Sequence, residues 1–309
     1  MTLATWIQQY EDDLDLKWLA INPSPNLIPY LETNSNMTDW YMVSTNSVAI
    51  ELIKKNKNYI HWSNICLNHH PDAIELIRNH HEHYINEWTQ KHRRIPYDMM
   101  LSWKNLSQNP SAIEFLEEYP FNELWFVQQP PYDPYEDDPD YEGNRYFETV
   151  VPDYLIDWDL LAQNSNPKAI DLLQANSEKF MWDWLSSNTS ERAIDFLRQH
   201  PDKINWPLLC QNPGAIDLIE SNYDKIIWPE LSKNEKAIHL LEANFDNIDW
   251  PYLSANPNAI HILEINHDKI DWRWLCKNPN AGRLFETNIE KIYDKLDWQW
   301  LSANPCIFI

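Results

Sequence analysis

The sequence predicts an all-α tandem-repeat solenoid. Three observations predict this class: tryptophans recur at a nearly constant interval, an asparagine follows at a fixed distance, and apolar residues lie at helical spacing between them. The chain of 309 residues contains 17 Trp and 21 Pro but 3 Gly. Because disordered chains lack aromatic residues, this composition indicates a folded chain.

The tryptophan interval defines the repeating unit. Trp206, Trp228, Trp250 and Trp272 are each 22 residues apart, and other tryptophans follow one another at 24. A fixed period of about 20 to 50 residues is the signature of a repeat array. In the N-terminal segment, Leu16 occupies the tryptophan position. The sequence therefore consists of about a dozen units of roughly 22–24 residues.

An asparagine column accompanies the tryptophans. An apolar residue comes three positions after the tryptophan position, a small residue comes four after it, and the asparagine comes six after it. The idealised unit reads W-x-x-L-S-x-N-P-x-A-I-x-L-L-E-x-N-x-D-K-I-x. The column consists of Asn46, Asn68, Asn109, Asn164, Asn188, Asn212, Asn234, Asn256, Asn278 and Asn304.

The Asn-Pro pair predicts the start of the main helix, because Asn caps free N–H groups and Pro fits the first helical position. In the unit from Asn256 we expect a helix from Pro257 through Leu263. Asn266 is expected to end that helix in the left-handed conformation, which Gly otherwise supplies. The segment before Asn-Pro, such as 206–209, has room for one short 3₁₀ or α turn.

Stacked units are expected to bury the Trp, Ile and Leu side chains that a single unit could not. Each unit combines one α-helix of about ten residues with one short helical turn. With packed helices about 8–10 Å apart, we expect a right-handed superhelix in the form of a curved rod on the order of 100 Å long. No polar capping repeat follows Asn304, so the last unit should expose an apolar end unless something covers it.

Two irregular segments interrupt the array. Residues 86–102 lengthen one tryptophan interval to 41 residues, and residues 126–152 form an acidic insert rich in Pro and Tyr. The predicted organisation is an N-terminal stack (1–125), the insert, and a C-terminal stack (153–309).

The repeat resembles the short W-x-x-L-S-x-N-P-x-A-I tandem repeats abundant in proteins of giant nucleocytoplasmic DNA viruses. Residues 224–272 are close to that family's consensus, and residues 304–308 resemble its terminal variant. The resemblance implies an interaction scaffold or a virion-associated protein, and it supplies no catalytic residues. In architecture alone, the unit also resembles the leucine-rich variant repeat, which alternates α- and 3₁₀-helices.

The formal net charge of −23 argues against general binding to nucleic acid or anionic membranes and favours basic protein partners. No run approaches the roughly 18 apolar residues of a membrane span, and the N-terminus does not resemble a signal peptide. We expect an intracellular, soluble protein in the virion or the host cytoplasm.

Catalytic residues, a metal and a cofactor are not expected. The chain has no G-x-S-x-G, no Gly-rich phosphate loop and no H-E-x-x-H. Cys66, Cys210 and Cys276 share the small-residue column, which favours a packing role over zinc binding. The histidines from His80 to His83 leave a metal site as a lesser alternative to a solvated, pH-sensitive patch.

The position between Ala-Ile and the following apolar pair must point away from the core. Its carboxylates would stack into an acidic ridge that gives way to His239, His261 and Arg283 near the C-terminus. The ridge is either a solvated face or a track for a basic partner. Its acidic members are Glu51, Glu75, Glu114, Asp171, Asp195 and Asp217.

Two further sets of residues are candidates for binding. Trp184, Trp274 and Trp300 lie outside the tryptophan column and are freer to be exposed. The insert is either a linker or a docking element that orders on contact. It combines aromatic and acidic side chains in Tyr132, Asp133, Tyr135, Glu136, Asp137 and Asp138.

These features favour a non-enzymatic protein–protein interaction scaffold, a viral structural or virion-associated protein with a capsid-associated or basic partner. The alternative is an acidic effector that captures a basic host or viral protein such as a histone. A metal-dependent enzyme is a third hypothesis. The sequence leaves the oligomeric state open.

Overall fold

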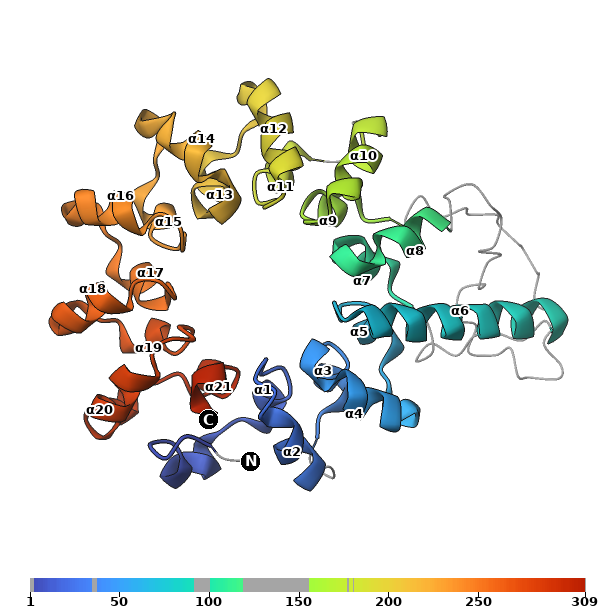
Figure 1. Ribbon diagram of the computed structural model, residues 1–309, viewed down its shortest axis with the longest axis horizontal. Coiled ribbons are helices and arrows are strands. Elements are labelled where there is room, and N and C mark those ends of the chain that lie inside the picture. The colour runs from blue at the N-terminus through green and yellow to red at the C-terminus, as the bar shows by residue number, and fades with distance from the viewer. Residues whose placement is uncertain are drawn as a thin grey trace, which may run out of the picture.

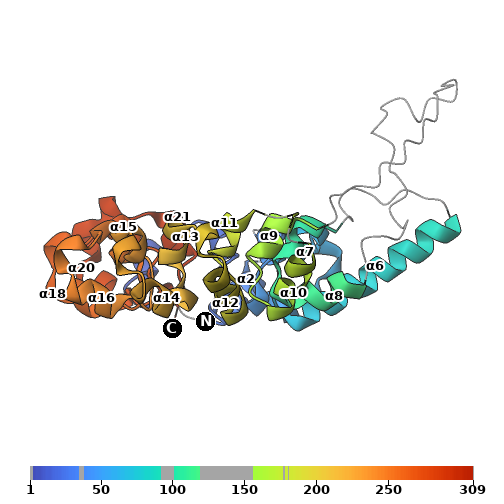
Figure 2. The same cartoon turned by 90° about the horizontal axis from the view of Figure 1, so that it is seen from above.

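The chain forms a closed ring of helical units (Figure 1). The structure is a computed structural model that describes residues 3–34, 38–91, 101–118, 156–176, 178–179 and 181–308. These residues form short α-helices and 3₁₀ turns with one isolated β-bridge, which confirms the all-α class. Figure 2 shows that the ring is shallow and that α6 (Pro71–Lys91) projects from it.

A short helix begins at the tryptophan position of each unit and lies on the inner side of the ring (Figure 1). In most units the preceding side chain caps this helix, as the Asp249 carboxylate does by accepting the N–H of Tyr252 at 3.1 Å. The inner helices are α1 (Leu16–Leu19), α3 (Trp40–Val43), α5 (Trp62–Ile65), α7 (Trp103–Gln108), α9 (Trp158–Ala162), α11 (Trp182–Leu185), α13 (Trp206–Gln211), α15 (Trp228–Leu231), α17 (Trp250–Ala255), α19 (Trp272–Leu275) and α21 (Trp298–Ser302).

A second helix follows the asparagine and lies on the outer side. In the unit from Asn256 it begins at Ile260, so the expected start at Pro257 is wrong. The Oδ1 of Asn256 accepts the N–H of Asn258 at 3.0 Å, and the intervening residues form a capping turn. The outer helices are α2 (Leu27–Thr33), α4 (Ile50–Lys55), α6, α8 (Ile113–Glu118), α10 (Pro167–Ala175), α12 (Glu191–Gln199), α14 (Ile216–Glu220), α16 (Ile238–Ala243), α18 (Ile260–Ile265) and α20 (Gly282–Ile292).

Most of the outer helices end in a side-chain hydrogen bond. Asn266 has φ −129° and ψ 50°, so the expected left-handed conformation is wrong. Its Nδ2 instead donates to the carbonyl oxygen of Ile262 at 2.8 Å, which satisfies a carbonyl that the helix end leaves free. A 3₁₀ turn that the sequence did not predict then leads to the next unit in η4 (Lys57–Tyr59), η7 (Pro201–Lys203), η9 (Tyr223–Lys225), η10 (Phe245–Asn247), η11 (His267–Lys269) and η12 (Tyr293–Lys295).

Buried asparagines join neighbouring units. The Nδ2 of Asn256 donates to two carbonyl oxygens of the preceding unit, those of Ser232 at 3.1 Å and Asn234 at 3.0 Å. Eleven asparagines form this column. The Nδ2 of Asn164 donates to the carbonyl oxygen of Ser107, and each of the ten others donates to two carbonyl oxygens, as Asn22 does. Since buried carbonyls need partners, this column ties each unit to the one before it. Its members are Asn22, Asn46, Asn68, Asn109, Asn164, Asn188, Asn212, Asn234, Asn256, Asn278 and Asn304.

The small-residue column makes a second set of bonds between units. The Ser232 hydroxyl donates to the carbonyl oxygen of Trp228 in its own inner helix, at 3.0 Å. The same Oγ accepts the N–H of Asp249 in the next unit, also at 3.0 Å. The column thus needs a small side chain that can be buried, and most units use one that also accepts a hydrogen bond. Ala20 and Ala162 fill the position in two units without that bond.

Both columns continue across the junction between the two chain ends. Asn22 donates to the carbonyl oxygens of Ser302 at 2.9 Å and Asn304 at 2.8 Å. The N–H of Asp15 donates to the Ser302 hydroxyl at 2.8 Å. The last unit therefore contacts the first as any unit contacts the next.

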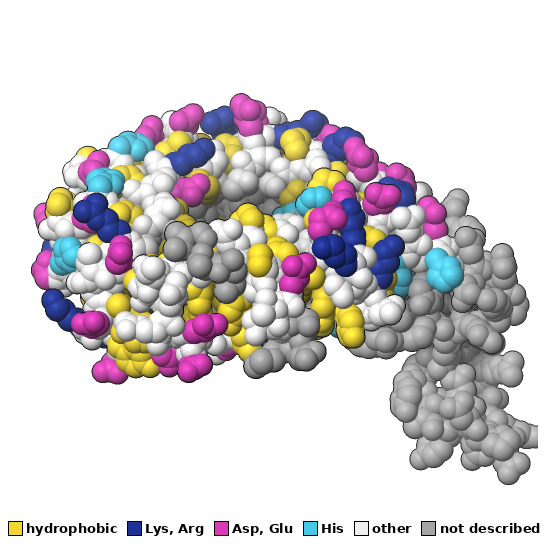
Figure 3. Space-filling model, turned by 60° about the horizontal axis from the view of Figure 1, so that its bottom comes forward, with side chains coloured by type: hydrophobic (Ala, Val, Ile, Leu, Met, Phe, Trp, Pro, Cys, Tyr) yellow, Lys and Arg dark blue, Asp and Glu magenta, His cyan; other side chains and the backbone are white. Residues whose placement is uncertain are grey.

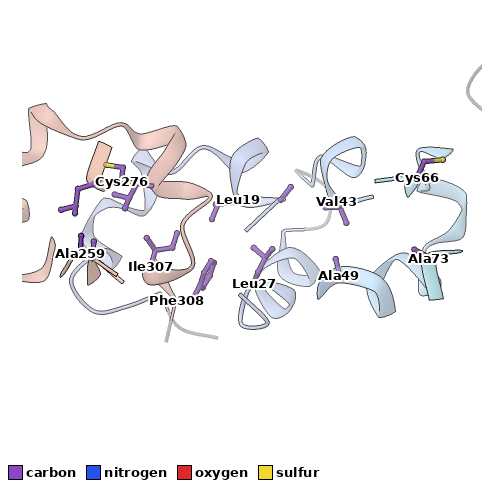
Figure 4. Close-up of a cluster of buried hydrophobic side chains, with 14 of the residues drawn as sticks. Leu19, Leu27, Val43, Ala49, Cys66, Ala73, Ala259, Cys276, Ile307 and Phe308 are labelled. Carbon is purple, nitrogen blue, oxygen red and sulfur yellow. The ribbon is translucent and has the colours of Figure 1, made fainter. Parts of the chain in front are cut away.

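The N-terminal segment covers the end of the last unit. Leu3 pairs with Phe308 in an antiparallel bridge, and the N–H of Ala4 donates to the carbonyl oxygen of Ile307 at 2.7 Å. The 3₁₀ helix η1 (Gln8–Asp13) then leads to the first inner helix. Figure 4 shows the apolar core running from the last units through Ile307 and Phe308 into the first units. The apolar end expected from the sequence is thus covered by the chain itself.

The prediction of a curved rod is wrong, because the curvature of the array closes it into a ring (Figure 1). The outer layer of a unit holds a helix and a 3₁₀ turn, whereas the inner layer holds one short helix, so each unit is a wedge. Eleven equal wedges close a circle when each unit is rotated by about 33° relative to the unit before it. The right-handed sense of the superhelix stays a prediction.

The units on either side of residues 119–155 stack directly. The N–H of Asp157 donates to the Ser107 hydroxyl at 3.0 Å, and Asn166 donates to the carbonyl oxygen of Pro110 at 2.9 Å. The two stacks predicted from the sequence therefore meet both here and at the chain ends.

Candidate binding surfaces

The acidic ridge lies on the outer helices, and its side chains are exposed. All six carboxylates predicted for it, Glu51, Glu75, Glu114, Asp171, Asp195 and Asp217, are exposed, as are the basic residues that follow them. The helical spacing that placed them outside the core is therefore correct. Whether the ridge binds a partner stays a prediction.

Most of the ridge is paired with cations. Asp171 contacts Arg192 of the following unit, and Glu114 contacts Lys168 at 2.8 Å. The hydrogen bond from the Lys168 ammonium lowers the pKa of Glu114 below its ordinary value. Asp195 lies 2.7 Å from Arg198, and Glu51 lies 3.0 Å from Lys54. Four of the six carboxylates thus have a cationic partner.

Glu75 and Asp217 form no ion pair within the described part of the chain. In the space-filling view, acidic and basic side chains alternate on the visible face and do not form one acidic stripe (Figure 3). The local field of the ridge is therefore weaker than its carboxylates alone suggest. The candidate residues of the insert, Tyr132, Asp133, Tyr135, Glu136, Asp137 and Asp138, lie outside the described residues.

The three cysteines of the small-residue column are buried, as predicted. The Cys66 thiol donates to the carbonyl oxygen of Trp62 at 3.2 Å, which is the bond a serine makes at this position. Burial raises the pKa of Cys66 and of Cys276 to about 12, so both remain protonated thiols at neutral pH.

The histidine cluster pairs with aromatic rings. The His80 ring stacks on Trp62 with centroids 3.3 Å apart, and the His81 ring meets the edge of Phe115 at 5.6 Å. Burial lowers the pKa of His81 to about 4. Among the residues that the structure describes, no three His, Cys, Asp or Glu side chains gather as a metal site requires.

A further candidate surface lies on the inner helices. The sequence predicted only part of it, the tryptophans outside the column (Trp184, Trp274 and Trp300). In most units the residues two and five positions after the tryptophan position point away from the core. They fall about 150° from the centre of the stripe formed by the buried residues at positions three and four. Of the 22 residues at these positions in the eleven units, three are charged: Glu230, Lys233 and Lys277. In a chain of net charge −23, these two positions of the inner helices are nearly uncharged.

Three consecutive units place aromatic rings on this face. The rings of Tyr252 and Trp274 meet edge to face at 5.2 Å, and those of Trp274 and Trp300 lie 5.4 Å apart. We call this set, with the cations Lys233, Arg273 and Lys277 that lie over its rings, the inner aromatic strip. The sequence shows that Trp274 and Trp300 lie outside the tryptophan column, but it does not show the ring contacts between their units.

No helix in the described ranges combines the length and the apolar composition of a membrane span. Comparisons of the chain with protein-family models, with curated proteins and with solved structures each found no match.

Proposed function

We propose that this chain is a non-enzymatic protein-binding ring, and that it serves as a structural or virion-associated scaffold of a giant virus. The viral assignment rests on the repeat resemblance in the sequence. The binding role rests on the two surfaces described above, of which the inner one carries few charges for an acidic protein.

The closure between Asn22 and Asn304 is the observation that carries the proposal. An open stack would offer its unpaired last unit to the first unit of another copy, and such head-to-tail contacts build filaments. Here the same contact is made within one chain. The ring therefore acts as a self-limited platform that binds other proteins through its faces.

The alternative function, capture of a basic protein, is supported by the net charge of −23. The ion pairs of Glu114, Asp171 and Asp195 oppose it, because these carboxylates are already neutralised by neighbouring cations. Electrostatic capture weakens steeply with salt, whereas apolar docking does not.

The experiment is an affinity pull-down from infected cells with the full chain and with residues 128–152 deleted, each washed at about 50 and about 300 mM salt. Under the proposal, a capsid or other virion protein stays bound at high salt. Recovery of histones and other basic proteins alone, all released at high salt, would replace the scaffold with the capture function.

A further inference from the structure

Three consecutive units expose a large apolar side chain where their outer helices end. Tyr223 and Phe245 begin the 3₁₀ turns after α14 and α16, and Ile265 is the last residue of α18. These helices follow one another on the outer side of the ring (Figure 1). The three side chains, which are 50%, 39% and 82% exposed, are called the outer apolar patch.

Contacts between units make the patch continuous. The Tyr223 hydroxyl donates to the Oδ1 of Asn244 in the next unit at 2.6 Å, which places Tyr223 beside the residue before Phe245. Phe245 reaches the following unit in the same way. The Nζ of Lys269, in the turn after α18, lies 5.2 Å from the centroid of the Phe245 ring. The patch therefore crosses two unit boundaries and ends at Ile265.

The fold does not require an apolar residue at the position of Ile265. The core side of α18 is formed by Ile262 and Leu263, which are buried. Other units carry Ala175, Gln199, Ser221 and Ala243 at the position of Ile265. Since no residue in the described ranges buries this side chain, only another molecule would remove its apolar surface from water.

The surroundings of the patch are acidic. The three segments that form it hold six carboxylates and two lysines: 220–225, 242–247 and 264–269. Lys225 pairs with the neighbouring Asp224 at 3.3 Å, and Lys269 lies over aromatic rings of the array. Two of the carboxylates, on Glu220 and Glu242, lie 2.6 and 2.9 Å from histidine rings of the next unit. The edge of the patch is therefore negatively charged.

The other three carboxylates are available to a ligand. Asp246, Glu264 and Asp268 are exposed and form no ion pair with any residue that the structure describes. They differ in this from most carboxylates of the acidic ridge, which already have cationic partners. Apolar surface and unpaired negative charge thus occur side by side.

We propose that the outer apolar patch binds a segment of another protein that carries Lys or Arg beside aliphatic side chains. The proposal rests on the protein-binding function above, and it adds a surface and the chemistry of the partner. Aliphatic side chains of the segment would cover Phe245 and Ile265. Its cations would form charge-assisted hydrogen bonds with Asp246, Glu264 and Asp268.

The charge around the patch favours this occupant over the others. A second copy of the chain would bring a surface of the same sign, because each copy has a net charge of −23. Nucleic acid and anionic membranes would place phosphates against the carboxylates. A neutral apolar segment would desolvate the carboxylates without pairing them, which costs binding free energy.

The test is fluorescence anisotropy with the full chain at about 150 mM salt and three labelled helical peptides of about 14 residues. The first peptide carries Leu on one side of the helix and Lys on the other. The second has Gln in place of Leu, and the third has Glu in place of Lys. Comparison of the three separates the apolar contribution from the electrostatic one.

One variant removes the apolar feature of the patch. Ile265→Ser replaces the most exposed apolar side chain, and Tyr59→Ser is its control because Tyr59 is 60% exposed in the turn η4, outside the patch.

A second variant removes the charge of the patch. Asp246→Asn with Asp268→Asn neutralises two unpaired carboxylates. Its control, Asp195→Asn with Asp202→Asn, neutralises two carboxylates that have cationic partners. Circular dichroism and thermal melting confirm that each variant folds.

We expect the Leu–Lys peptide to bind and each substituted peptide to bind at least about tenfold more weakly. Both patch variants should lose at least about fivefold in affinity for the Leu–Lys peptide, and both controls less than about twofold. The proposal is overturned if the Leu–Lys peptide does not bind, if either substituted peptide binds equally well, or if the patch variants bind as their controls do.

The pull-down with the same variants separates this proposal from the protein-binding function. Loss of the partner with Ile265→Ser and its retention with Tyr59→Ser would support the patch as the docking site. Retention of the partner by both patch variants would overturn the patch proposal and leave the protein-binding function in place. A wild-type chain that retains no partner at either salt concentration would contradict that function itself.

Discussion

The side-chain Nδ2 of Asn22 lies 2.8 Å from the carbonyl oxygen of Asn304, a residue 282 positions further along the chain. The equivalent contact between Asn256 and Asn234 measures 3.0 Å and spans 22 positions. The two ends of the chain therefore meet through the same hydrogen bond that joins adjacent units. Closing the array in this way leaves no terminal unit without a neighbour, and so removes the need for the polar capping repeats that open solenoids use.

Replacing Asn22 should cost as much stability as replacing an asparagine inside the array. Asn22→Ala and Asn234→Ala each remove two hydrogen bonds to buried carbonyl oxygens of the neighbouring unit. Each also removes the acceptor of a backbone N–H in the following turn, that of Ser24 or that of Lys236. We expect each to lower the free energy of unfolding by about 2–4 kcal/mol, measured by urea denaturation. In an open rod Asn22 would lie at a frayed end, and its replacement would have little effect.

Asn234→Asp separates the two roles of this column. The carboxylate can still accept the N–H of Lys236, as Oδ1 of Asn234 does at 3.0 Å, but it has no hydrogen to donate to the carbonyls of the preceding unit. Destabilisation at neutral pH at least equal to that of Asn234→Ala is the expected result. A stability near that of the wild type would show that capping alone explains the column.

A circular permutant should fold. We would join residue 308 to residue 3 through a short flexible linker and place the new termini within 128–152, which the repeat pattern assigns to no unit. Because Leu3 and Phe308 already pair, the linker imposes no strain. The expected result is a cooperative melt with the circular dichroism of the parent, whereas a molten or aggregated product would contradict the closed ring.

The sequence predicted the unit but not its closure. The column from Asn46 to Asn304 and its capping role are visible in the spacing alone, because capping depends on residues two positions apart. Closure depends on the small rotation between successive units, which adds up over the whole array. The sequence of a single unit does not show it. The N-terminal residues that complete the ring, such as Leu3 and Ala4, match no repeat position and therefore gave no signal. The ridge could be placed on the surface from helical period, but two of its cations, Lys168 and Arg192, come from the following units, and the spacing within one unit does not show them.

His81 should make stability depend on pH. Burial lowers its pKa from 6.5 to about 4, so between these values the unfolded chain binds a proton that the folded chain does not. Stability is therefore lost as the pH falls from 7.5 to 5, by about 2 kcal/mol from this group. His81→Phe keeps an aromatic ring beside Phe115 and should remove that part of the loss in urea denaturation at the two pH values. His69→Gln, at an exposed position, is the control and should melt as the wild type does at both.

The ion pairs of the ridge predict which carboxylates attract a basic ligand. Asp171→Asn with Asp195→Asn removes two charges that already have partners, whereas Glu75→Gln with Asp217→Asn removes two that have none in the described structure. In a binding assay with a lysine-rich peptide at low salt, the second pair should weaken binding more than the first. An equal or reversed effect would mean that the ion pairs leave the ridge fully available.

Hydrogen exchange of the backbone amides of Ala4 and Asp15 tests ring closure most directly. The first donates to the carbonyl oxygen of Ile307 and the second to the hydroxyl of Ser302, both at the far end of the chain. A closed ring predicts protection comparable to that of the Asp249 amide, which makes the same bond to Ser232 inside the array. Exchange of both amides at the rate of an unstructured N-terminus, with Asp249 protected, would show that the array is open in solution.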